Sequence, residues 1–197
     1  MPRRYTMARR DEVKAETRAR IVAATVRLYR EVGVDGATVA VVARAADVAP
    51  ATVRNHFPGP TDLADAAAEA ILAEVGMPDA SIFDGAAGLP ERLDRLLVEV
   101  AAFFERSTGW WEVRVADQRA GNAWEAAEAA YDARIADLIR VAVDPLGNDP
   151  FVVSTIAAVL VHVYFGARTA GRSSAEAVAE ERSLLLPWLM TRRPAPT

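Results

Sequence analysis

Apolar residues recur at intervals of three and four positions along most of this chain, the spacing that places them on one face of an α-helix. Helix-favouring alanine, leucine, arginine and glutamate are abundant, and no stretch of four or more residues alternates convincingly between apolar and polar positions. The pattern predicts an all-α protein of about nine helices.

Capping and helix-breaking residues locate these elements. Thr38 and Thr61 each supply a hydroxyl before a predicted helix, Pro50 suits a first helical position, and Ser173 and Glu176 have the spacing of a capping box. Residues 76–88 lack periodicity and predict a loop. The predicted helices span residues 11–31, 39–46, 50–56, 62–75, 90–106, 110–119, 123–143, 150–171 and 174–190, the last bent at Pro187.

The longest apolar run covers residues 151–167. It is shorter than the roughly 20 residues that cross a bilayer, and acidic Asp144 and Asp149 precede it where a basic flank would stand. A helix buried on most sides is the favoured interpretation, and a membrane span is the alternative. The first ten residues are polar and basic without an apolar region after them, so we expect no secretory signal and a cytoplasmic location.

Composition excludes several kinds of chemistry. The chain of 197 residues contains no cysteine, which rules out disulfides, thiolate metal sites and cysteine nucleophiles. Its two histidines, His56 and His162, lie far apart in the sequence and do not have the spacing of a metal cluster. No phosphate-binding glycine loop or nucleophile elbow is present, so we expect no enzyme, no metal and no cofactor.

The net charge of −4 conceals an uneven distribution. Residues 1–60 carry eleven basic and six acidic side chains, whereas residues 61–197 carry twelve basic and twenty-one acidic ones. A basic segment joined to an acidic one favours nucleic-acid contact by the first, and a solvated basic terminus is the alternative. We therefore expect a DNA-binding domain over residues 1–60 and a second helical domain over residues 61–197.

Residues 39–57 have the dimensions of a DNA-binding helix-turn-helix: two short helices joined by the turn Asp47-Val48-Ala49. Ala43 is small enough for a close helix crossing, and Asp47 tolerates the left-handed conformation that the first turn position usually adopts. The apolar residues expected to interlock across the turn are Val42, Ala46, Val48 and Val53.

Residues 16–75 resemble the N-terminal domain of the TetR family of transcriptional regulators. The resemblance rests on Ile21-Val22-Ala23-Ala24, Leu28-Tyr29, Gly33, Ala37-Thr38-Val39, Val42-Ala43, Thr52-Val53 and His56-Phe57-Pro58. It implies a homodimer that binds a palindromic operator and releases it when a small molecule occupies the C-terminal domain. Repression and activation both remain open.

Two positions depart from the family pattern. Arg54 stands where a tyrosine is common and Pro60 where a lysine is common, and both family residues usually contact phosphate. Arg54 can still bind a phosphate or a guanine, and a flexible basic arm can replace the lysine by entering the minor groove. The candidate DNA contacts are Arg3, Arg4, Arg9, Arg10, Thr38, Pro50, Ala51, Thr52, Arg54, Asn55 and His56.

Phe57, by contrast, is expected in the core. His56 is expected either to bind a phosphate or to pack beside Phe57.

In the C-terminal domain, aromatic residues and a few polar ones suit an effector pocket, with ordinary core packing as the alternative. The candidate pocket residues are Phe103, Phe104, Trp110, Trp111, Arg114, Gln118, Trp124, Tyr131 and His162. Arg114 and Gln118 share a helix face and suit a carboxylate or carbonyl group.

The helices predicted over 151–170 and 174–190 are more apolar than one buried face requires, so we expect them to form a four-helix bundle with a second copy. The alternative function is a small-molecule carrier or sensor that has lost specific operator binding, which the departures at Arg54 and Pro60 motivate.

Overall fold

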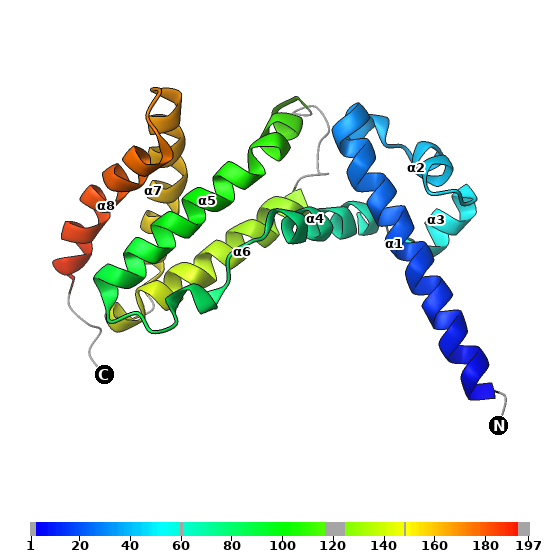
Figure 1. The fold of residues 1–197 in the computed structure, drawn as a ribbon, viewed down its shortest axis with the longest axis horizontal. Helices are drawn as coiled ribbons and strands as arrows, with labels where there is room; N and C mark the ends of the chain where they lie inside the picture. Colours follow the sequence, from blue (N-terminus) through cyan, green and yellow to red (C-terminus); the bar gives the residue numbers. More distant parts are fainter. Residues whose placement is uncertain (1–2, 60, 117–124, 148, 193–197) are drawn as a thin grey trace. The chain divides into compact units, whose positions relative to one another are not determined.

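The computed structural model describes residues 3–192 except 60, 117–124 and 148. The described residues form eight α-helices and no strand, which confirms the all-α prediction (Figure 1). The helices are α1 (Arg3–Gly36), α2 (Val39–Ala45), α3 (Pro50–His56), α4 (Asp62–Val75), α5 (Leu89–Ala116), α6 (Glu125–Ala142), α7 (Pro150–Thr169) and α8 (Ser174–Met190). Short 3₁₀ turns cover Ala80–Phe83 and Asp144–Leu146.

The helix count differs from the predicted nine because two predicted helices are one. The segments 90–106 and 110–119 were expected to be separate, but α5 continues from Leu89 through Gly109 to Ala116. One interior glycine costs only about 1 kcal/mol relative to alanine, and helix-forming residues flank Gly109 on both sides. The glycine therefore does not end the helix.

Helix α1 also begins earlier than the predicted residue 11. It starts at Arg3, because the segment after Pro2 contains no further glycine or proline before Gly33. Gly33 interrupts it with φ of 73°, a left-handed conformation that glycine adopts readily, and the helix then resumes to Gly36. The stop predicted at Gly33 is thus a break within the helix.

The chain divides into two compact units, which we call unit 1 (Met1–Glu74 with Thr108–Ala129) and unit 2 (Val75–Ser107 with Ala130–Thr197). In unit 1, α1, α2 and α3 share one apolar core. In unit 2, α7 and α8 pack side by side, and α5 and α6 contribute further buried residues such as Leu96 and Ile139. The domain boundary between residues 60 and 61 remains a prediction.

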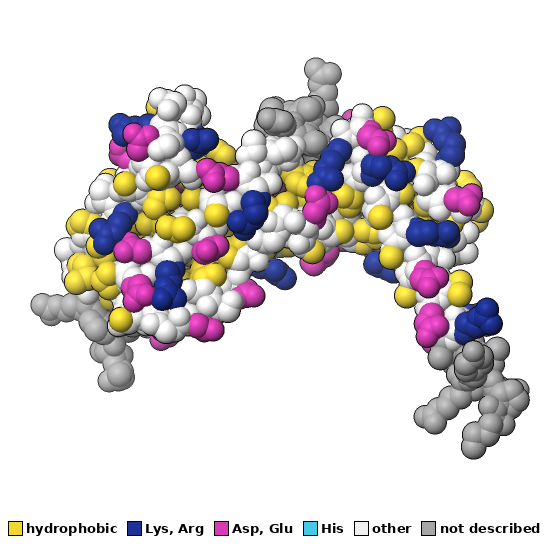
Figure 2. All heavy atoms as spheres, viewed as in Figure 1, with side chains coloured by type: hydrophobic (Ala, Val, Ile, Leu, Met, Phe, Trp, Pro, Cys, Tyr) yellow, Lys and Arg dark blue, Asp and Glu magenta, His cyan; other side chains and the backbone are white. Residues whose placement is uncertain are grey.

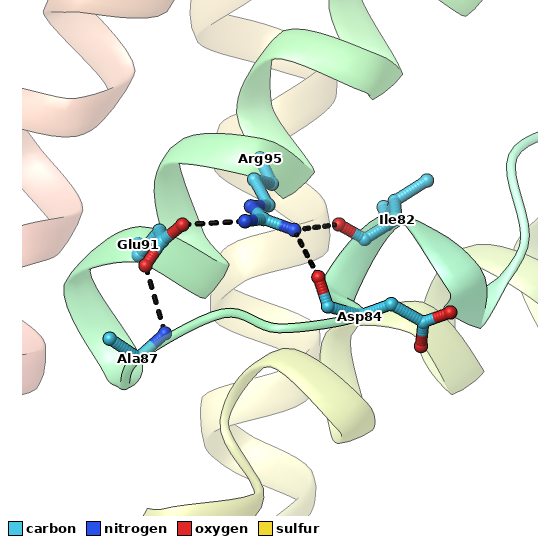
Figure 3. A network of polar contacts seen from close by, with 5 residues as sticks. All are labelled: Ile82, Asp84, Ala87, Glu91 and Arg95. Atoms are coloured by element: carbon cyan, nitrogen blue, oxygen red, sulfur yellow. Dashed lines mark hydrogen bonds and ion pairs between the residues drawn. The ribbon is translucent and has the colours of Figure 1, made fainter.

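Arg95 of α5 forms hydrogen bonds to the segment that precedes this helix (Figure 3). Its Nη1 donates to the carbonyl oxygens of Ile82 at 3.0 Å and Asp84 at 2.8 Å, while Nη2 donates to Glu91 at 2.6 Å. Glu91 in turn accepts from the amide of Ala87 at 2.8 Å, and this bond and Arg95 lower the pKa of the Glu91 carboxyl. The predicted loop 76–88 therefore includes a 3₁₀ turn and is held against α5 within unit 2.

Candidate functional site

The helix-turn-helix is built as the sequence predicts. Asp47 has φ of 53° in the turn, and the amide of Val48 donates to the carbonyl of Ala43 at 2.9 Å. The predicted small residue Ala43 is buried at the crossing of α2 and α3. The shared core contains Ile21, Ala24, Leu28, Val42, Ala43, Ala46, Val53 and Phe57, with Val48 packed against it.

Both short helices begin at their predicted caps. The amide of Val41 donates to the Thr38 hydroxyl at 3.4 Å, which places Thr38 at the N-cap of α2. Pro50 occupies the first turn of α3, where its missing N–H removes no helical hydrogen bond. Both residues are exposed, so their predicted places at the operator are accessible.

Helix α3 presents a polar surface because only Val53 of its seven residues is buried. Ala51, Arg54 and Asn55 are exposed, and Thr52 is half-buried. No ion pair or hydrogen bond engages the Arg54 guanidinium among the residues that the structure describes. Arg54 and its neighbours are therefore available to a duplex.

Phe57 is 5% exposed and confirms its predicted place in the core, where the guanidinium of Arg18 lies 4.6 Å from its ring centroid. The half-buried His56 ring lies 6.4 Å from that of Phe57, centroid to centroid. Its Nδ1 is buried and has no hydrogen-bond partner within the described part of the chain. Packing beside Phe57 is thus observed, and a phosphate contact by His56 stays a prediction.

The four arm arginines do not form an extended tail. Arg3, Arg4, Arg9 and Arg10 all belong to α1, and Arg9 and Arg10 are exposed on it. The flexible form expected for this arm is therefore wrong, because the segment is helical; contact with DNA by its arginines remains a prediction. Several Lys and Arg side chains are visible on the face of unit 1 in Figure 2. Pro60 lies outside the described residues.

The candidate effector residues fall into separate groups. Phe103 of α5 and Tyr131 of α6 are brought together: their rings stack at 5.6 Å between centroids with an interplanar angle of 17°. Phe104 lies 6.2 Å from Tyr131 and also contacts Tyr164 and Phe165 of α7, at 5.1 and 5.0 Å. These five rings form a continuous group in unit 2, which we call the aromatic cluster.

Other candidates lie elsewhere. Trp110 is buried in unit 1, with the guanidinium of Arg30 lying 4.1 Å from its ring centroid. His162 is exposed on α7, in a shallow groove shared with Ser154, Thr155, Ala158, Val159 and Val163. The side chains of Trp111 and Arg114 and the whole of Gln118 and Trp124 lie outside the described parts. Their ligand-binding roles stay predictions.

Sequence reasoning missed the most unusual polar residue of unit 2. Glu181 is 1% exposed, yet neither carboxylate oxygen has a hydrogen-bond partner among the described residues. Burial raises the pKa of its carboxyl to about 8. The sequence did contain a signal for the burial of Glu181, which is its four-residue spacing. The buried residues of α8 are Ala177, Glu181, Leu185 and Leu189. Because Glu181 stands between the charged residues Glu180 and Arg182, however, the local sequence is typical of a solvent-exposed helix face.

Tyr131 is a second residue of unit 2 whose buried polar group lacks a hydrogen-bond partner in the described part of the chain. Its hydroxyl is buried and has no hydrogen-bond partner among the described residues. Burial raises the pKa of the phenol, and the negative charges of Asp132 and Glu181 raise it further. Tyr131 and Glu181 are thus both residues of unit 2 whose buried side-chain oxygens make no hydrogen bond to the described residues.

A core-supported helix-turn-helix with an exposed second helix, joined in one chain to further helices with their own core, defines a DNA-binding transcriptional regulator. The family model for bacterial regulatory proteins of the tetR family matches residues 21–67. The match covers the helix-turn-helix and parts of the helices on either side of it, so residues 21–67 are similar to the DNA-binding domain of these regulators.

Solved structures support the same fold. The multidrug binding protein EbrR, crystallised with imidazole, has a TM-score of 0.60 and 21% identity over 91% of this chain and 96% of its own. A structure from Rhodococcus sp. assigned to the TetR family of transcriptional regulators has a TM-score of 0.54 and 23% identity, over 86% of this chain and 96% of its own. No curated protein matches the chain.

Proposed function

We propose that this protein is a homodimeric repressor that binds a palindromic operator and leaves it when a small molecule occupies the domain formed by residues 61–197. The observation that carries the proposal is the construction of α3. Val53 anchors this helix to the core, while Ala51, Arg54 and Asn55 are exposed, and the Arg54 side chain makes no hydrogen bond or ion pair with the described residues. In this proposal α3 is the recognition helix, and the protein acts in the cytoplasm.

Each exposed residue has a role in the proposed complex. Arg54 donates two hydrogen bonds to guanine O6 and N7 or binds a phosphate, and Asn55 meets a base edge. Thr38 at the start of α2 lies beside a phosphate, where helix N-termini favour anions. Arg9 and Arg10 on α1 supply further positive charge in place of the lysine that the family usually carries after the recognition helix.

Dimerisation through α7 and α8 is favoured by their exposed apolar residues. Phe151, Leu184 and Met190 are 61%, 53% and 63% exposed in the single chain. Helix α7 is long and apolar enough to cross a membrane by length and composition, and 28% of its most apolar window is buried. A partner subunit that covers these faces accounts for the apolar surface without a membrane.

Effector release needs a connection between the aromatic cluster and the DNA-binding helices. Helix α4 follows the DNA-binding helices in the chain and precedes the helices that carry the aromatic cluster. Side chains of α1 and α5 bond to residues at its C-terminal end. Arg30 of α1 forms an ion pair with Glu74, and Arg106 of α5 donates to the carbonyls of Val75 and Gly76. A ligand that shifts α5 would move the end of α4 and change the spacing of the two recognition helices. EbrR is described as binding drugs, which supports a small-molecule effector.

Electrophoretic mobility shift with DNA flanking the protein's own gene, at low and moderate salt, tests the proposal. A specific shift that weakens as salt rises is expected, because phosphate contacts release counterions. Absence of a specific shift at either salt concentration would instead identify a carrier or sensor that does not bind an operator.

A further inference from the structure

Helix α1 continues beyond the core of unit 1 at its N-terminal end (Figure 1). From residue 9 to residue 20 the side chains are exposed, apart from the half-buried Thr17, and the first buried residue after them is Ile21. Most helical stability in proteins comes from a packed face, which these turns lack within the described structure. Their surface is therefore open to a partner.

Arg18 lies where these turns meet α3. Its guanidinium carbon is 4.6 Å from the ring centroid of Phe57, the residue at the C-cap of α3. The Arg18 side chain is exposed and forms no ion pair or hydrogen bond with any described residue. A guanidinium that lies over an aromatic ring keeps the N–H donors at its edge, in the planar fork that matches a phosphate group. The contact with Phe57 thus orients the donors of Arg18 without using them.

Basic residues at four-residue intervals follow one face of α1 and form what we call the basic stripe: Arg10, Lys14 and Arg18. All three are exposed. Glu12 and Glu16 stand two positions from the nearest stripe residues, which places them about 200° around the helix, on its other side. Asp11 borders the stripe. Positive charge is therefore concentrated on one side of these turns.

The basic stripe continues the line along which α1 packs against the helix-turn-helix. Ile21 and Leu28 of the shared core stand three and ten positions after Arg18, spacings that keep them near the same helix face. Arg18 itself reaches the end of α3, whose last turn carries the basic residues Arg54 and His56. The stripe is thus continuous with the surface that α3 presents to a duplex.

We propose that Arg18 and Lys14 bind the phosphate backbone of the duplex beside the bases that α3 contacts, with Arg10 one turn further along α1. The inference rests on the proposed function, since it extends the DNA-binding surface from α3 onto α1. Lys14 and Arg18 were not among the contacts predicted from the sequence. Phosphate contacts carry no sequence information, so this pair adds affinity and fixes the position of α3 on the duplex without choosing bases.

The salt dependence of binding to two duplexes tests this inference. One duplex carries the site that the full-length protein selects from random DNA, and the other is a scrambled duplex of the same length and composition. Each phosphate contact contributes about 0.9 to the slope of log affinity against log salt concentration, through counterion release. Arg18→Ala and Lys14→Ala should each lower the slope by about this amount on both duplexes. Between roughly 50 and 200 mM salt, each variant should lose about three- to fourfold less affinity than the wild type.

Arg20→Ala is the matched control. Arg20 carries the same charge and is exposed on the same turns of α1, but it lies two positions after Arg18, about 200° around the helix. This variant should keep the wild-type slope. Arg18→Lys retains the charge and should also keep the slope, although the loss of the planar fork weakens binding to both duplexes. Thermal unfolding of each variant reports whether it is folded.

An unchanged slope in either Arg18→Ala or Lys14→Ala would overturn the inference, as would an equal fall of the slope in Arg20→Ala. If the wild type prefers the selected duplex while these variants keep its slope, the inference fails and the proposed function stands. If the wild type binds both duplexes equally while Arg18→Ala and Lys14→Ala lower the slope, the proposed function fails and the phosphate contacts stand.

Discussion

Arg106 of α5 donates from its Nε to the carbonyl oxygen of Val75, the last residue of α4, at 2.8 Å. Its Nη2 donates to the carbonyl of Gly76 at 2.8 Å. The final carbonyls of a helix lack intrahelical donors, so a cationic side chain at this end stabilises it. Arg106 lies one turn along α5 from Phe103, which means that the same helix contacts both the aromatic cluster and the end of α4.

Arg106→Ala should destabilise the C-terminal turn of α4. Loss of two charge-assisted hydrogen bonds is expected to cost about 1–3 kcal/mol. Hydrogen exchange measured by mass spectrometry should show faster exchange in the last turn of α4, and urea unfolding should show the lower stability. Arg92→Ala is the control, since Arg92 makes a comparable bond to the Val141 carbonyl at 2.8 Å, at the end of α6. Faster exchange in α4 for both variants would contradict the specific role of Arg106.

Arg54→Ala should weaken operator binding. If Arg54 contacts a base, the loss is about 1–3 kcal/mol and specificity relaxes at one position of each half-site; if it contacts phosphate, the salt dependence falls instead. Fluorescence anisotropy with labelled operator at several salt concentrations separates these outcomes. Arg140→Ala, which removes an arginine paired with Asp137 in α6, should leave affinity unchanged. Unaltered binding by Arg54→Ala would remove α3 from its proposed role.

Leu184→Glu should dissociate the proposed dimer, because it places a charge on the exposed apolar face of α8. Sedimentation equilibrium of the wild type should reveal a dimer, and the variant should sediment as a monomer at the same concentration. Val98→Glu is the matched control for Leu184→Glu, since Val98 on α5 and Leu184 on α8 are 54% and 53% exposed. A wild type that is monomeric at every concentration would exclude dimerisation through α7 and α8.

Glu181 should make stability depend on pH. Its folded-state pKa of about 8 lies above its ordinary value of 4.5, so the folded protein holds a proton that the unfolded chain has released between these values. Stability should therefore fall as pH rises through this window, by up to about 1.4 kcal/mol per pH unit, and level off above it. The phenol of Tyr131 stays protonated throughout, because burial raises its pKa above its ordinary value of 10.0.

Glu181→Gln removes this titration and isolates it from all others. Urea unfolding at about pH 5 and about pH 8 should show that the variant gains stability relative to the wild type as pH rises. A stability difference that is the same at both pH values would mean that Glu181 is already ionised or already paired in the free protein.

The sequence predicted most of the fold, since local rules decide where these helices begin. Thr38 caps α2, Pro50 opens α3, and Ser173 and Glu176 form the predicted capping box at the start of α8. The errors concern whether a helix continues through a glycine or breaks there. Gly109 lies within a helix and Gly33 lies at a break, although both are glycines in helix-forming surroundings; the difference depends on backbone geometry that a periodic pattern does not encode.

The site was less predictable because it depends on which helix faces meet. Phe103 and Tyr131 were expected in one pocket and do stack, yet Trp110, only seven positions after Phe103, packs beneath Arg30 in unit 1. Glu181 was overlooked because its neighbours Glu180 and Arg182 are charged and exposed. Its four-residue spacing from Ala177 and Leu185 acquires meaning once α8 is known to bury that stripe.

Selection of binding sites from random double-stranded DNA tests the central claim most directly. A dimer with α3 as its recognition helix should enrich a palindrome whose half-sites are spaced by about one helical turn, roughly 10 base pairs between centres, or a multiple of it. Arg54→Ala should fail to enrich that palindrome at the same protein concentration. Enrichment of no sequence by the wild type, or of a single site without twofold symmetry, would contradict the account.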